Sequence, residues 1–251
     1  MKKIVILFLF FICLSLFSCE QRKNEGTTKV ILTLFDLSES TARPDIRAAY
    51  VKAFKRIIEV LKEGDSLLGA CITERSIQQI DLPVEFEHPI FRPSTDNPLL
   101  RSGERDEFEK RISSMKEERI KRVDELVIGK EGQPKILKTD IMSSVMLAAN
   151  ILKRYPERRR ILVIFSDMIE DSESYNFERL KLTDKKIKEI IEKEKNRGMI
   201  PELNGVRVYI TGAQARTLEM YNSIKKFWTE YFRVTGAELV EYSSTFLGLR
   251  E

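Results

Sequence analysis

Short apolar runs alternate along the chain with segments whose apolar residues recur at helical spacing. The strongest runs lie at residues 29–35 (KVILTLF) and 160–166 (RILVIFS), and such nearly continuous runs are typical of strands buried on both faces of a parallel sheet. Further strands are expected at residues 65–72, 78–86, 206–211 and 238–242. Pro83 weakens the prediction for 78–86, because proline cannot donate to a strand ladder.

Helices are expected between these strands, at residues 44–61, 104–127, 140–155, 184–197 and 217–234. The first begins at Pro44, and its apolar positions are Ile46, Ala49, Val51, Phe54, Ile57, Ile58 and Leu61. The second is densely charged and keeps only a narrow apolar stripe, which predicts a long, largely solvated helix. The prolines at 89, 93 and 98 predict a loop before it.

This alternation predicts a three-layer, doubly wound α/β fold with a mainly parallel sheet. The 251 residues suffice for one such domain, expected at 29–251 with a charged helical insertion at about 100–135. Ligands of these sheets bind at the carboxyl ends of strands where the strand order reverses. The residues just after Phe35 and Ser166 are therefore the first candidates for a site.

Charge and composition exclude several classes. Lys and Arg number 43 against 39 Asp and Glu, and loss of a leader with Lys2 and Lys3 would leave a net charge of +2. This balance is too even for a dedicated nucleic-acid binder. With 11 Gly and 8 Pro, the chain is neither collagen-like nor of low complexity.

The first residues predict a secretory leader. Lys2 and Lys3 precede the apolar residues 4–17, a run shorter than the roughly 20 residues that span a bilayer. Residues 16–19 (LFSC) resemble the bacterial lipobox, which implies a signal peptide at 1–18 and a lipid on Cys19. Plain secretion and an uncleaved anchor are the alternatives. The lipobox implies a cell-envelope protein anchored to a membrane, on the periplasmic or the surface side.

The remaining cysteines and the next residues agree with a lipid anchor. Cys13 would leave with the leader and Cys19 would carry the lipid. Cys71 would then be the one remaining cysteine, so no internal disulfide is expected. Cys71 is expected to be a small buried residue of a strand. Residues 20–28 lack large apolar side chains and are expected to form a flexible linker.

A motif of acidic and hydroxyl side chains follows the first strong strand. Residues 36–40 read DLSES, and Asp167 follows the strand at 160–166. The motif Asp36, Ser38 and Ser40 resembles the metal-ion-dependent adhesion site (MIDAS) of von Willebrand factor type A (VWA) domains. The family also takes a threonine before a central helix and an aspartate after the fourth strand, which match Thr139 and Asp167. The resemblance covers about residues 29–243, with Met168 where the family commonly has glycine.

The resemblance implies a divalent metal. Two carboxylates and three hydroxyls offer only oxygen, which favours Mg²⁺, Mn²⁺ or Ca²⁺ over zinc or copper. By resemblance, the hydroxyls of Ser38, Ser40 and Thr139 bind the ion directly, Asp36 and Asp167 hold waters, and a partner's acidic side chain completes the shell. The alternative is that these residues only cap turns and helix starts.

Other polar and aromatic residues have plainer interpretations. His88 is expected in a surface loop. Glu170, Asp171 and Glu173 lie just past Asp167, where they could shape the rim of the site, although a solvated loop is the expectation. Asp140 fits either a further acceptor at the site or an acid in the first turn of a helix. Trp228 and the aromatic residues beside it are expected to pack a helix on the sheet.

Three functions remain for this chain. The first is a lipid-anchored, non-catalytic module that binds a protein partner through a metal. The second is a scaffold of the same fold that uses no metal. The third is a Mg²⁺-dependent phosphoryl-transfer hydrolase resembling the haloacid dehalogenases, but that family needs a second aspartate where this chain has Ser38. Neither a glycine-rich dinucleotide turn nor a P-loop motif occurs in the sequence.

Overall fold

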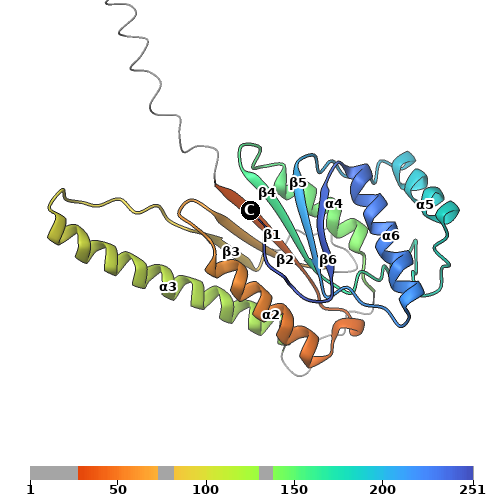
Figure 1. Cartoon of the computed structure of the whole chain (residues 1–251), viewed down its shortest axis with the longest axis horizontal. Coiled ribbons are helices and arrows are strands. Elements are labelled where there is room, and N and C mark those ends of the chain that lie inside the picture. Colours follow the sequence, from red (N-terminus) through yellow and green to blue (C-terminus); the bar gives the residue numbers. More distant parts are fainter. Residues whose placement is uncertain (1–27, 73–81, 130–137, 251) are drawn as a thin grey trace, which may run out of the picture.

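The computed structural model describes residues 28–72, 82–129 and 138–250 (Figure 1). Its strands are β1 (Lys29–Asp36), β2 (Ser66–Ile72), β3 (Val84–Glu87), β4 (Arg159–Phe165), β5 (Val206–Thr211) and β6 (Glu238–Ser243). Its helices are α2 (Pro44–Glu59), α3 (Pro98–Ile128), α4 (Ile141–Leu152), α5 (Asp184–Asn196) and α6 (Leu218–Thr235), with a 3-10 turn η1 (Glu39–Thr41) after β1.

The strands form one sheet in the order β3-β2-β1-β4-β5-β6. All neighbours are parallel except β3, which runs antiparallel to β2 at the edge. The predicted mainly parallel α/β fold is therefore confirmed. The strand order reverses between β1 and β4, so the ends of these two strands form the switch point at which such sheets bind ligands.

Helices cover both faces of the sheet (Figure 1). Alternate side chains of β1 point to opposite faces, so Leu32 and Leu34 pack toward α4, α5 and α6 while Ile31 and Phe35 pack toward α2 and α3. All four are fully buried. Burial on both faces explains the continuous apolar runs of the central strands.

The elements after β2 differ in detail from the sequence prediction. The strand expected at 78–86 is shorter and begins after Pro83, at Val84, and residues 73–81 lie outside the described part of the chain. Pro98 lies in the first turn of α3 rather than in a loop, because Asn97 caps the helix by accepting from the Leu99 amide at 3.1 Å. The predicted charged helix is a single helix of 31 residues.

Helix α2 buries most of the expected positions, including Phe54, Ile57 and Ile58, with one difference. Tyr50 is buried and Ala49 is exposed, whereas the apolar pattern placed Ala49 inward. The tyrosine ring packs against Phe165 with the ring centroids 5.4 Å apart. The large aromatic residue takes the inward position because it buries far more apolar area than alanine.

The predicted leader, Cys19 and the linker to residue 27 lie outside the described residues. Within the described part of the chain, no helix is both long and apolar enough to cross a membrane. Cys71 lies on β2, as expected, and is half-buried.

Candidate metal site

Asp36 ends β1 with a fully buried carboxylate. Its Oδ1 accepts from the Ser38 amide at 3.0 Å, and its Oδ2 accepts from the Ser166 hydroxyl at 2.7 Å. The second bond follows from the register, because Phe35 pairs with Phe165 and the next residues of β1 and β4 face each other. Nothing in the sequence marks Ser166 for this role, because it depends on the pairing of the two strands.

The turn after Asp36 brings two serine hydroxyls together. The Thr41 hydroxyl donates to the Asp36 carbonyl oxygen at 2.8 Å and fixes the turn. The Oγ atoms of Ser38 and Ser40 then lie 3.0 Å apart. Ser38 is buried and Ser40 is exposed, so the hydroxyl pair leads from the protein interior to its surface.

Asp167 follows β4 and lies close to Asp36. Its Oδ1 accepts from the Ile169 amide at 2.9 Å, and the side chain is almost completely buried. Burial, followed by the charge of Asp36, raises the pKa of Asp167 to about 7. Burial also raises the pKa of Asp36. Two carboxylates in this arrangement repel each other unless a cation or a proton lies between them.

Thr139 is held beside the segment that follows Asp167. Its amide donates to the Asp171 carbonyl at 2.9 Å, and the Asp171 amide donates back at 3.0 Å. Thr139 is buried and lies two residues before α4. The backbone of Thr139 is thus tied to the loop that follows Asp167, although 102 residues of chain lie between the end of β1 and Thr139.

Glu170 is a site residue that the sequence analysis placed in a solvated loop. This expectation is wrong, because Glu170 is fully buried and its Oε2 accepts from the amides of Ile141 and Met142 at 2.9 and 3.2 Å. Its carboxylate therefore binds the amino-terminal end of α4. Burial and the charge of Asp140 raise the pKa of Glu170 to about 8. Asp171 and Glu173, in contrast, are half-buried and exposed.

Two polar groups of α2 also reach this region. The Tyr50 hydroxyl and the Arg47 Nε are buried without a hydrogen-bond partner in the described structure. The charges of Asp36 and Asp167 act on the Tyr50 hydroxyl and add to the effect of burial, which raises its pKa. Gly212 permits this approach, because a Cβ there would lie 2.6 Å from the hydroxyl. An unpaired buried hydroxyl beside two carboxylates fits a site that holds water or ion-bound water.

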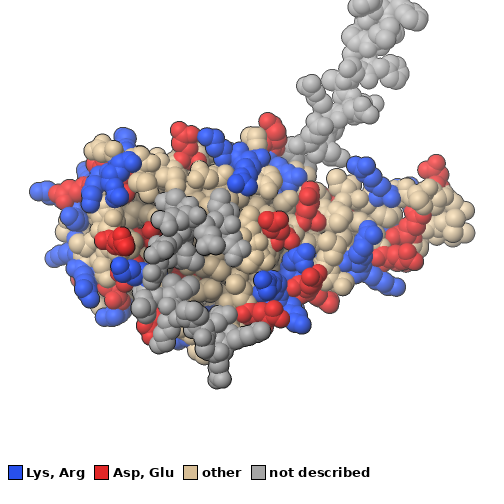
Figure 2. All heavy atoms as spheres, turned by 180° about the vertical axis from the view of Figure 1, so that it is seen from behind, with Lys and Arg blue, Asp and Glu red and all other residues tan. Residues whose placement is uncertain are grey.

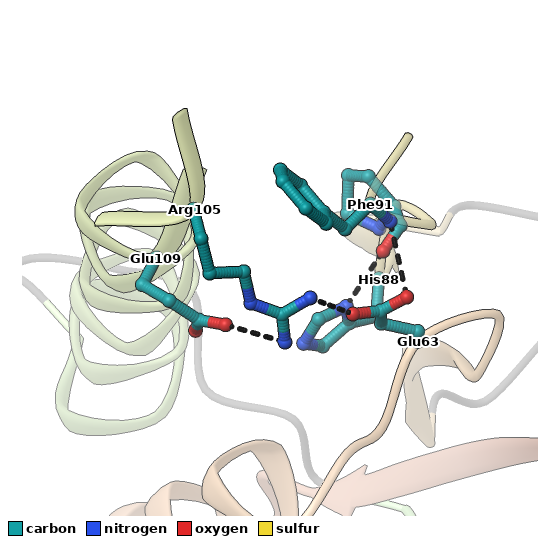
Figure 3. Close-up of polar contacts among 6 residues, drawn as sticks. Glu63, His88, Phe91, Arg105 and Glu109 are labelled. Carbon is teal, nitrogen blue, oxygen red and sulfur yellow. Dashed lines mark hydrogen bonds and ion pairs between the residues drawn. The ribbon is translucent and has the colours of Figure 1, made fainter. Parts of the chain in front are cut away.

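The other residues singled out in the sequence have structural roles. Asp140 caps α4 by accepting from the Ser143 amide at 2.9 Å, as a helix-start acid does. Trp228 is fully buried and donates to the Met168 carbonyl at 2.8 Å, which confirms the packing interpretation. His88 is buried rather than on the surface, with Nδ1 at 3.0 Å from the Pro89 carbonyl, because α3 covers this loop (Figure 3).

Comparisons with known proteins bear on the fold. No protein-family model and no curated protein matches the chain. Solved structures do match, among them the PilB minor pilin from Streptococcus sanguinis, with a TM-score of 0.50, 14% identity, and coverage of 90% of this chain and 59% of that one. The likeness shows the fold alone.

Two further matches are weaker. A von Willebrand factor type A structure from Catenulispora acidiphila has a TM-score of 0.40 and 12% identity, over 84% of this chain and 42% of that one. Proximal thread matrix protein 1 from the mussel byssus has a TM-score of 0.44 and 11% identity, over 88% and 43%, and a further structure of it has a zinc-occupied MIDAS motif. The chain spans less than half the length of these two proteins.

The donor set of the site fits a hard cation. The described residues contain no group of three or more His, Cys, Asp or Glu that could hold a metal, so any ion here depends on hydroxyls as well as carboxylates. Four predicted ligands meet at the switch point: Asp36, Ser38, Ser40 and Asp167. Their carboxylate and hydroxyl oxygens suit Mg²⁺, Mn²⁺ or Ca²⁺, and the unpaired Tyr50 hydroxyl can bond to an ion-bound water.

Proposed function

We propose that this chain is a VWA-like lipoprotein, anchored to a membrane of the cell envelope, that binds a protein partner through a divalent metal and has no catalytic activity. One observation carries the proposal. Asp36 and Asp167 are two buried carboxylates at the switch point of the sheet, and neither forms an ion pair within the described residues. Buried carboxylates without an ion-pair partner are costly, and a bound cation reduces that cost.

Five side chains would hold the metal. The hydroxyls of Ser38, Ser40 and Thr139 would bind it directly, and Asp36 and Asp167 would bind through water. When bound, the ion supplies a Lewis-acidic position that takes up an acidic side chain of the partner. The protein's own part is to fix the hydroxyl pair with Thr41 and the carboxylates with backbone amides and Ser166.

A metal titration tests the site. Isothermal calorimetry of the protein with Mg²⁺ and with Mn²⁺ should detect one weak site, and Asp36→Ala should lower the affinity by at least about tenfold. Asp45→Ala is the matched control, because Asp45 is an exposed aspartate in the first turn of α2. Equal affinities in the folded Asp36→Ala variant and in the control would contradict the metal site.

The membrane anchor is tested separately. Mass spectrometry of the membrane fraction should find an amino-terminal Cys19 carrying lipid, because the lipobox resemblance places the cleavage before this residue. Cys19→Ala should move the protein out of that fraction. An unchanged mass and location in this variant would contradict lipidation.

The two alternatives make different predictions. A metal-independent scaffold would bind its partner equally well in chelator. A hydrolase would release phosphate from a panel of phosphate esters in the presence of Mg²⁺. The sequence has Ser38, rather than a second aspartate, two residues after Asp36, which argues against the hydrolase.

A further inference from the structure

Exposed apolar side chains gather at the amino-terminal edge of the sheet, meaning the side where β1, β2 and β4 begin, opposite the candidate site. Seven large apolar residues of the described chain are strongly exposed, and four of these lie at or near the edge where β1, β2 and β4 begin: Val60, Ile90, Leu99 and Leu100. Leu99 is the most exposed of all, at 86%. Such a concentration at one end of a molecule is typical of an interaction surface.

Helix α3 carries the two leucines beyond this edge. Arg105 pairs with Glu63 at 2.8 Å, and Glu63 lies in the turn just before β2, so Arg105 is level with the edge. The residues from 98 to 104 continue outward from there, by about 10 Å at 1.5 Å per residue. Figure 1 shows this end of α3 reaching past the start of β1.

The projecting end of α3 is braced. The rings of Phe91 and Phe108 lie 5.2 Å apart, and the Arg105 guanidinium lies 4.9 Å from the Phe91 ring. Arg105 also pairs with Glu109 at 2.8 Å, while Glu63 accepts from the Phe91 amide at 3.0 Å (Figure 3). These contacts join the helix to the loop before it, so the leucines are held outward by an ordered support.

Basic residues lie at the same edge. Residues 153–160 (KRYPERRR), which join α4 to β4 and include the first two residues of β4, have five basic residues and one acidic residue. Lys153, Arg154 and Arg159 are exposed. Figure 2 shows blue side chains next to the point where the grey segment leaves the body. Such a cluster attracts anionic phospholipid headgroups.

The chain enters the domain at this edge as well. Lys29 begins β1, and nine residues, 20–28, lie between it and Cys19, so that ten residue steps join the two. Ten residues reach at most about 35 Å, so a lipid on Cys19 would keep this edge near the membrane surface. The projection of α3 is shorter than that reach, so the anchor permits Leu99 and Leu100 to touch the same membrane.

We propose that this edge docks on an anionic phospholipid bilayer, with Leu99 and Leu100 entering the interface and residues 153–160 lying on the headgroups. The inference goes beyond the metal site and rests on the proposed anchor at Cys19. Leu99 and Leu100 project from a helix start and do not line the pocket beside them, which Ile90, Phe91 and Phe108 help to form, and a deformable lipid surface accepts such a projection. Docking would turn the candidate metal site away from the membrane.

A tryptophan introduced at the projecting end of α3 tests the proposal. The lipidated full-length protein is placed in phosphatidylethanolamine and phosphatidylglycerol vesicles that contain a lipid brominated on its acyl chains. Leu99→Trp should lose roughly half or more of its added fluorescence to the bromine, because the indole enters the interface. Leu218→Trp is the matched control, an exposed leucine in the first turn of α6 at the opposite edge, and should not be quenched. Trp228 is fully buried, and its signal is subtracted with the parent protein.

The charge contribution is tested in the Leu99→Trp background. Lys153→Glu with Arg154→Glu should reduce the quenching about twofold, and so should vesicles of phosphatidylcholine alone, because the headgroup attraction is lost. Lys185→Glu with Lys188→Glu changes the charge equally on exposed positions of α5 and should leave quenching unchanged.

The outcomes separate docking from anchoring. If the Leu99→Trp variant floats with the vesicles but its fluorescence is not quenched, docking is overturned and the anchor stays in place. Protein that does not float overturns both. If the fluorescence emission of the Leu99→Trp variant shifts to shorter wavelength only when an extract of membrane proteins is added, the start of α3 binds a protein partner and the lipid proposal is overturned.

Discussion

Met168 has a backbone conformation that glycine favours. Its φ is +68°, in the left-handed region, and it is the one non-glycine residue of the described chain with a positive φ. The conformation is held from several sides, since the Met168 amide donates to the Ser166 hydroxyl at 2.9 Å and its carbonyl accepts from Trp228. The side chain is fully buried. Packing thus compensates for a strained backbone next to Asp167.

Replacing Met168 separates packing from strain. Met168→Ala should lower the free energy of unfolding by about 2–5 kcal/mol, because a buried side chain is lost and the strain stays. Met168→Gly loses the same packing but relieves the backbone, so it should be about 1 kcal/mol more stable than the alanine variant. Urea denaturation measures both. An alanine variant as stable as the glycine variant would show that the position is unstrained.

At the scale of elements, the start of α4 depends on a buried carboxyl. Glu170 accepts from two amides of the first turn of α4, and its second oxygen, Oε1, is buried without a partner in the described structure. Thr139 lies two residues before α4, so the protonation of Glu170 should affect the position of Thr139 in the candidate site. The pKa of Glu170 is raised from 4.5 to about 8, chiefly by burial and then by Asp140.

The raised pKa predicts that stability falls as pH rises. Between pH 4.5 and pH 8 the folded protein keeps a proton on Glu170 that the unfolded chain releases, so unfolding becomes easier with increasing pH across this window. Glu170→Gln should flatten the profile by roughly 4 kcal/mol over that range. Thermal unfolding in chelator at several pH values measures it.

Glu173→Gln serves as the control, because Glu173 is exposed on the same loop. Asp36 and Asp167 also have raised pKa values, and they are present in the parent protein and in both variants. Their contribution to the pH profile is therefore common to all three proteins. Parallel profiles for the parent and Glu170→Gln would contradict a protonated Glu170 in the folded state.

At the scale of the whole molecule, the candidate metal site and the start of the domain lie at opposite edges of one sheet. Asp36 ends β1 and Lys29 begins it, so eight residues of strand separate the two edges. The proposed lipid anchor would confine the domain near a membrane and raise the effective concentration of another envelope protein, so that even a weak contact at the site would be sufficient for binding.

The partner interaction should depend on the metal. Capture of a partner from solubilised envelope should be lost in chelator and restored by Mg²⁺, since the partner's carboxylate needs the ion. Thr139→Ala should weaken capture several-fold, because it removes one of the proposed direct ligands. Thr183→Ala is the matched control, a threonine that caps the start of α5. Capture that survives both chelator and Thr139→Ala would place binding on another face.

Much of the fold follows from the sequence alone. The continuous apolar runs predicted β1 and β4, and helical spacing predicted α2, α4, α5 and α6 to within a few residues. These predictions succeed because burial on both faces of a central strand, or on one face of a helix, dictates residue type directly. The sequence also predicted the motif of Asp36, Ser38 and Ser40, because its members are neighbours in one turn.

The tertiary structure decided what depends on contacts between distant segments. The sequence cannot show that Ser166 would donate to Asp36, or that Glu170 would be buried, because the pairing of β1 with β4 and the approach of α4 create those environments. Contacts between distant segments also explain two further burials. Helix α3 covers His88, and the Tyr50 ring packs against Phe165 of β4. Polar residues carry no periodic signal of their own burial, so only the assembled layers reveal it.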